Sequence, residues 1–177
     1  QNAINILNSI EELEQRKIDL EAPVAKVVEA EKQSSELSQS TLNEFSKVFE
    51  EILQRWNFPE SERVHFDTQT RDFVISGKPR GARGKGMRAI THAAFNIALL
   101  DYTERESLPH PGFVVLDTPL LAYREPESDE DDLSGTNVHE CFFSELARVT
   151  DRQVIVLENV DPPSNDKAGS KKTYFSK

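Results

Sequence analysis

The sequence is poor in cysteine and has no long hydrophobic run. Cys141 is the single cysteine among 177 residues, which excludes an internal disulfide framework and a cysteine-rich zinc site. No apolar run approaches the roughly 20 residues that a membrane-spanning helix needs, and no signal-peptide pattern opens the chain. We therefore expect a cytoplasmic protein with no membrane partner.

Positive charge is also scarce. The chain has 21 Lys and Arg residues against 31 Asp and Glu residues, for a formal net charge of −10. This balance argues against nucleic-acid binding through bulk charge, although it leaves room for a local basic site. The length is sufficient for one sizeable domain.

The first 32 residues carry the apolar repeat of a coiled coil. Apart from Lys17, the positions spaced by three and four are apolar: Ala3, Ile6, Ile10, Leu13, Leu20, Val24 and Val27. This heptad pattern predicts a coiled-coil helix over residues 1–32 that packs on one partner helix, with a kink near Pro23. An ordinary amphipathic helix is the alternative. Gln1 falls in mid-pattern, so we expect further chain upstream.

Residues 33–161 predict one α/β domain, and residues 162–177 a polar, mobile tail. The periodicity of the apolar residues switches between the helical and the strand period along this domain. It predicts a helix over 42–56, a hairpin of strands 63–67 and 72–76, a helix over 89–102, a strand at 113–116, a helix over 138–149 and a strand at 154–157.

Both strands of the second half are apolar throughout and end on polar residues. Phe113 to Leu116 runs into Asp117, and Val154 to Leu157 runs into Glu158 and Asn159. Such strands are typical of central parallel strands that are covered on both faces. Their carboxyl ends meet at one sheet edge, where open α/β sheets bind ligands. A strand-end aspartate suits Mg²⁺, which prefers hard oxygen ligands, although capping of the following turn is the structural alternative for Asp117.

A glycine-rich basic segment, Ser76 to Arg88, precedes the apolar helix. It holds four glycines and five basic residues. Gly84, Gly86 and the helix N-terminus could offer backbone N–H groups to an anion, with Lys85 and Arg88 adding charge. The GxxxxGK[ST] phosphate loop is absent. A flexible surface loop with solvated charges is the alternative.

The order of these segments resembles the C-terminal lobe of an ABC-type ATPase head, of the SMC and DNA-repair coiled-coil kind. The segment 84–99 resembles the family's signature loop and helix, 114–119 its Walker B strand, and 153–159 its switch strand. The resemblance implies a P-loop NTPase-like α/β head half-domain behind a coiled-coil helix. It implies ATP and Mg²⁺ as cofactors, and an upstream lobe or a second head, as in a homodimer, as partner. DNA or a nuclease or effector subunit would be a further partner.

The resemblance also implies roles for particular residues. Asp117 would hold Mg²⁺ or its water, and Gly84, Lys85, Gly86 and Arg88 would contact the γ-phosphate bound by the opposite head. The sequence departs from the family at Thr118, which stands where a catalytic glutamate is usual. Glu158 is the candidate to replace that glutamate, with a solvated strand-end charge as the alternative. Hydrolysis would otherwise be slow.

Two other classes of function fit the same residues. One is a non-catalytic module that pairs through its coiled coil and docks partners on the α/β lobe. The other is a DNA-binding protein whose segment 78–88 grips phosphates. We expect His92 to be packed within its helix and the six carboxylates of 125–132 to face water. No hydrolase triad or zinc-binding HExxH pattern is present.

Overall fold

The computed structural model describes residues 10, 12–17, 37–121, 132–159, 162 and 171–174. The chain divides into two compact units, Gln1–Gln39 and Ser40–Lys177. Most of the predicted coiled coil and of the polar tail lies outside the described residues. Among those that are described, no helix has the length and apolar character needed to cross a membrane.

The first unit is helical at Ile10 and residues 12–17, and it is not helical at Leu37 and Ser38. The seam residues Ile10 and Leu13 are 47% and 65% exposed. Both side chains therefore present apolar surface to solvent. The coiled coil itself stays a prediction.

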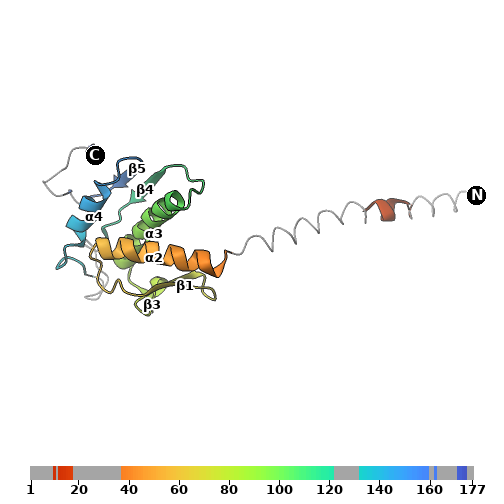
Figure 1. Ribbon diagram of the computed structural model, residues 1–177, viewed down its shortest axis with the longest axis horizontal. Coiled ribbons are helices and arrows are strands. Elements are labelled where there is room, and N and C mark those ends of the chain that lie inside the picture. Colours follow the sequence, from red (N-terminus) through yellow and green to blue (C-terminus); the bar gives the residue numbers. More distant parts are fainter. Residues whose placement is uncertain are drawn as a thin grey trace, which may run out of the picture. The chain divides into compact units, whose positions relative to one another are not determined.

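The second unit is a mixed α/β domain, as the sequence predicts, with two small sheets. Its elements in chain order are α2 (Gln39–Arg55), β1 (Val64–Asp67), β2 (Asp72–Ile75), β3 (Lys78–Pro79), η1 (Arg80–Ala82), α3 (Lys85–Arg105), β4 (Phe113–Asp117), α4 (Val138–Leu146) and β5 (Gln153–Leu157). Figure 1 shows the β1–β2–β3 sheet on one side of helices α2 and α3, and strands β4 and β5 on the other.

The three-stranded sheet grows from the predicted hairpin. Strands β1 and β2 pair antiparallel, with Val64 opposite Ile75 and Asp67 opposite Asp72. The short strand β3, which the sequence pattern did not reveal, pairs antiparallel with β2. Pro79 is tolerated there because β3 lies at the edge of the sheet, where a missing N–H breaks no central ladder.

An aromatic cluster joins this sheet to the two long helices. Phe45 and Phe49 of α2 pack on Phe73 of β2 with ring centroids 5.7 and 5.1 Å apart. Phe95 of α3 lies 5.3 Å from Phe45 and 5.9 Å from Phe73. These tilted and edge-on pairs bury large apolar areas and favour one arrangement of the rings. They fix the hairpin against α2 and α3.

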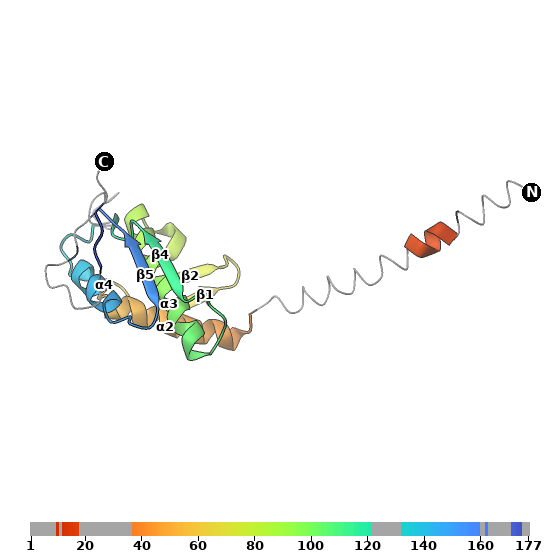
Figure 2. The same ribbon diagram turned by 90° about the horizontal axis from the view of Figure 1, so that it is seen from above.

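The remaining elements form a helix–strand–helix–strand layer, as predicted. Strand β4 pairs with β5 in parallel, with Phe113 opposite Gln153 and Asp117 opposite Leu157. Figure 2 shows the two strands side by side. Helix α4 packs its Phe142 on Trp56 at the end of α2, with ring centroids 4.8 Å apart. The layer is thereby joined to the rest of the core.

One face of the parallel sheet is buried and the other is open, which corrects the prediction of strands covered on both faces. Val114 and Leu116 are 7% and 3% exposed, whereas Phe113 and Val115 are 48% and 51% exposed. On β5, Ile155 and Leu157 are likewise exposed. Helix α3 packs on one face. No described segment covers the second face, so buried and exposed side chains alternate along each apolar strand.

Two further expectations need correction. His92 lies on the exposed side of α3, where its ring stacks on Phe95, because the helix has one solvent-facing side even though its sequence is apolar nearly all round. Helix α3 also begins earlier than predicted, at Lys85, so part of the glycine-rich segment is its first turn. Ile90, Ala94, Ile97, Ala98 and Leu100 are all buried as predicted.

Candidate functional site

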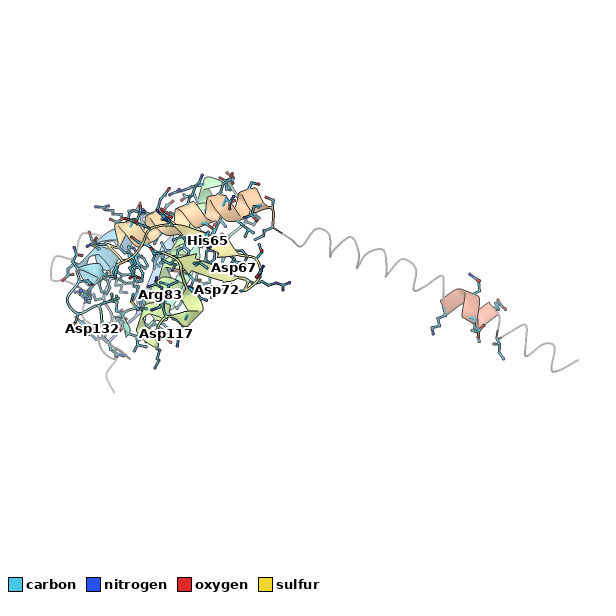
Figure 3. The ribbon with its side chains drawn as sticks, turned by 90° about the horizontal axis from the view of Figure 1, so that it is seen from below. His65, Asp67, Asp72, Arg83, Asp117 and Asp132 are labelled. Atoms are coloured by element: carbon cyan, nitrogen blue, oxygen red, sulfur yellow. The ribbon has the colours of Figure 1, made fainter. Side chains whose placement is uncertain are left out.

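The parallel register brings the two polar strand ends together. Asp117 is the last residue of β4 and lies opposite Leu157, the last residue of β5, so Glu158 follows at the same edge. Asp117 is exposed and Glu158 is half-buried. The predicted pair of carboxylates therefore does share one sheet edge. Figure 3 shows Asp117 apart from His65, Asp67 and Asp72, which gather at the hairpin.

The chain turns sharply directly after Asp117. Thr118 has a φ of +49°, a left-handed conformation that is costly for a β-branched residue. Its N–H donates to the carbonyl oxygen of Leu157 at 2.8 Å, which extends the ladder by one bond. Its hydroxyl donates to Oδ1 of Asp117 at 3.0 Å. Thr118 therefore orients the carboxylate but offers no group that could act as a base.

Glu158 is tied to the segment that follows Thr118. Its Oε2 accepts a hydrogen bond from the N–H of Leu120 at 2.8 Å, and its Oε1 accepts one from the N–H of Asn159, also at 2.8 Å. Leu120 is fully buried, so its N–H needs an acceptor within the protein. No sequence pattern predicts this contact, because the two residues are 38 positions apart.

The same edge lies at the N-terminal end of α3. At the opposite end, Arg152, just before β5, donates from Nη1 to the carbonyl oxygen of Leu100 at 2.9 Å and pairs with Asp101. Since β5 starts beside the C-terminal part of α3 and β4 packs along the helix, both strands run back toward Lys85. The fold thus brings Asp117 and the glycine-rich segment to one end of the domain.

The residues that are predicted to contact phosphate differ in their exposure to solvent. Gly84 is the N-cap residue of α3, and as a glycine it has no side chain of its own to cap the helix. Lys85 is exposed, Gly84 and Arg88 are half-buried, and Gly86 is buried. The first turn contains no acidic residue, which suits an anion at a helix N-terminus. Lys85 is the member of this set that lies most open to solvent.

Three arginines of the basic segment make hydrogen bonds within the domain, so their charges are not all solvated as in the alternative of a surface loop. Arg80 donates from Nε to Asp72 at 2.8 Å. Arg83 is 3% exposed, and its Nη2 donates to the carbonyl oxygen of Ile75 at 2.8 Å while the guanidinium lies over the ring of Phe58. Arg88 donates from Nη1 to the carbonyl oxygen of Arg83. These contacts reduce the positive charge that the segment presents to solvent.

Arg83 is a structural residue that sequence reasoning missed. An arginine between glycines in a basic run is typical of a solvated charge, yet here it lies in the core, and its Nε has no hydrogen-bond partner in the part of the chain that the structure describes. Its Nη1 also reaches Glu60 at 3.4 Å. Arg83 thus connects the hairpin, the segment after α2 and the start of α3.

The metal-binding capacity of the edge is limited. Across the described ranges, no group of three or more His, Cys, Asp or Glu side chains is placed to hold a metal ion. Mg²⁺ in nucleotide sites is commonly bound by one or two carboxylates, with water and phosphate oxygens completing its shell. The exposed carboxylate of Asp117 fits that kind of shared site and does not form a complete metal site by itself.

Comparison with known proteins adds no family to these observations. No model of a protein family matches the chain, and a search of curated proteins finds no match either.

Proposed function

We propose that this chain is the C-terminal part of an ATP-binding head of a coiled-coil ATPase of the ABC type. Asp117 would bind Mg²⁺ or its water, and the start of α3 with Gly84, Lys85, Gly86 and Arg88 would contact a phosphate of nucleotide held by another head. DNA repair, chromosome handling or defence against foreign DNA are the processes in which such a head would act.

The observation that carries this proposal is the shared end of the domain. An exposed aspartate ends a parallel strand, a second carboxylate follows the neighbouring strand, and helix α3, with the exposed Lys85 in its first turn, begins at the same end. Strand ends hold side chains rigidly, and a helix N-terminus attracts anions. Together these features suit a nucleotide with its Mg²⁺ bridging phosphate oxygens.

The open face of the β4–β5 sheet supports the need for a second lobe. Parallel strands are normally covered on both faces, but Phe113, Val115, Ile155 and Leu157 are between 38% and 51% exposed. Asp117 lies on this same face of β4, because side chains alternate along a strand. A lobe that covers the apolar face would therefore lie next to the proposed Mg²⁺ ligand, as the phosphate-holding lobe must.

The open face also favours a second candidate function, a non-catalytic interaction module. Thr118 replaces the expected glutamate, and the exposed apolar side chains could bind a partner protein without any chemistry. In that case Asp117 would serve only to accept the hydrogen bond of Thr118.

The test is ATP hydrolysis by the full native polypeptide with Mg²⁺, as wild type and as Asp117→Asn. We expect the substitution to reduce kcat by at least about 100-fold, since metal charge contributes several kcal/mol in such sites. The matched control is Asp67→Asn, a half-buried aspartate at the hairpin, which should leave the rate unchanged. Wild-type protein that neither hydrolyses nor binds ATP would favour the interaction module.

A further inference from the structure

The segment that leaves β4 must pass from an exposed edge into the core within three residues. Asp117 is exposed, whereas Pro119 and Leu120 are buried, with Leu120 at 0% exposure. Buried backbone donors need acceptors, because a buried N–H without one has lost its bond to water and gained nothing in return. Pro119 has no N–H, so Thr118 and Leu120 supply the backbone donors of this turn.

Both donors are directed to the end of β5. Thr118 donates to the backbone carbonyl oxygen of Leu157 and Leu120 donates to the carboxylate of Glu158, each at 2.8 Å. One of the two bonds therefore depends on a side chain. The other oxygen of that carboxylate accepts the N–H of Asn159, so both oxygens of Glu158 are engaged with backbone groups.

We propose that Glu158 is a positioning residue that holds the turn at Thr118–Leu120, and through it the carboxylate of Asp117, instead of activating water. The left-handed backbone at Thr118 is strained, and such a conformation persists where its surroundings fix it. The bond from Leu120 to Glu158 is one of those restraints. This inference rests on the proposed function for its effect on hydrolysis, but not for its effect on the turn.

Two substitutions separate the positioning role from a base. Glu158→Gln keeps the size of the side chain and one carbonyl oxygen that can accept the Leu120 N–H, but it cannot take up a proton. Glu158→Ala removes the acceptor altogether. For a positioning residue we expect Glu158→Gln to retain kcat within about 3-fold and Glu158→Ala to lose about 10-fold or more, since the Ala variant loses a hydrogen bond to a charged group.

The dependence of kcat on pH is a further readout, and a purely structural role of Glu158 would not change it. If Glu158 positions the turn, Glu158→Gln should retain the wild-type dependence of kcat on pH. If Glu158 is the base, the acid limb of the profile should disappear with the Gln variant, and both variants should be equally inactive. Equal loss in the two variants would overturn the proposal. If the Ala variant fails to fold, the pH profile of Glu158→Gln decides alone: loss of its acid limb would overturn the proposal.

Hydrogen exchange of the Leu120 amide tests the turn without any nucleotide. We expect exchange to be about 10-fold faster in Glu158→Ala and near the wild-type rate in Glu158→Gln, with amides of α2 as the internal reference. Unchanged exchange in the Ala variant overturns the inference, and so does faster exchange that leaves the hydrolysis of an active protein unaffected. If wild type shows no hydrolysis and the exchange result is as expected, the proposed function fails while Glu158 keeps its role in the turn.

Discussion

Arg83 is a buried cation, and its contacts decide what its loss would do to the fold. Burial of a charge is costly unless the group is well paired. Here Nη2 donates to the carbonyl oxygen of Ile75 at 2.8 Å, whereas Nη1 lies 3.4 Å from the carboxylate of Glu60. Among the described residues, Nε has no hydrogen-bond partner. The guanidinium thus serves mainly to satisfy the carbonyl of Ile75 and to pack on Phe58.

We predict that Arg83→Met destabilises the domain by about 1–3 kcal/mol, because the carbonyl of Ile75 then lies buried without a donor. The free energy of unfolding, measured by denaturant titration, checks this value. Arg71→Met is the control, since Arg71 is exposed at the hairpin turn and surface substitutions usually change stability by less than about 0.5 kcal/mol. A neutral Arg83→Met would mean that relief of the buried charge offsets the lost hydrogen bond.

At the scale of single residues, the sequence could locate Asp117 and Glu158 at one edge but could not reveal their partners. The alternation from an apolar run to a carboxylate is local and visible in the chain. The bond between Glu158 and Leu120 joins residues far apart in sequence, and the burial of Arg83 depends on Phe58 and Ile75 from other segments. Neither contact has a sequence pattern.

At the scale of elements, the two faces of β4 provide a matched comparison. Val114 and Val115 are neighbours of the same type, and they are 7% and 51% exposed. We predict that Val114→Thr lowers the free energy of unfolding by about 1–2 kcal/mol, because a hydroxyl enters the core without a partner. Val115→Thr should change it by less than about 0.5 kcal/mol.

Binding of an apolar fluorescent dye checks the open face in the same pair of variants. Val115→Thr should reduce dye binding by the native protein, since it removes apolar surface from the patch, whereas Val114→Thr should not reduce it. Equal destabilisation by the two substitutions would contradict the assignment of the faces. It would mean that β4 is covered on both sides in solution.

Most of the longer elements were predictable, because the apolar spacing is regular, as in α2, or because apolar residues are dense, as in α3, β4 and β5. Which face of each element is covered was not predictable. A run apolar on both faces has no polar side to mark solvent, so Phe113 and Val115 gave no sign of exposure. Along α3, too, no clearly polar side marks the face that meets solvent, which led to the wrong expectation for His92.

At the scale of the whole molecule, hydrogen-bonded carboxylates make stability depend on pH. At Asp72, burial opposes ionisation, but the hydrogen bonds from Arg80 and from the Phe73 N–H outweigh it and lower the pKa below the ordinary 3.8. Hydrogen bonds from the Gln69 N–H and the Thr70 hydroxyl lower the pKa of Asp67. Those from Ser134 lower the pKa of Asp132.

The sign of the effect follows from these directions. A carboxyl whose pKa is lower in the folded state contributes stability above its unfolded pKa, and this contribution is lost as pH falls through the folded value. We predict that the thermal midpoint declines below about pH 4. Asp72→Asn should cost about 0.5–1 kcal/mol at neutral pH and show a shallower acid decline, measured by thermal scans from pH 7 to 2.5. An unchanged slope would indicate that the pair with Arg80 is absent in solution.

The single tryptophan gives the molecule a built-in optical reporter. Trp56 is 1% exposed and meets Phe142 where α2 joins α4. The emission maximum of its indole ring should therefore lie at the short wavelengths that are typical of an apolar environment. Detachment of α4 alone would move the emission to longer wavelengths before the helix content of the domain is lost. Loosening of α4 can thus be followed in real time without attaching a label.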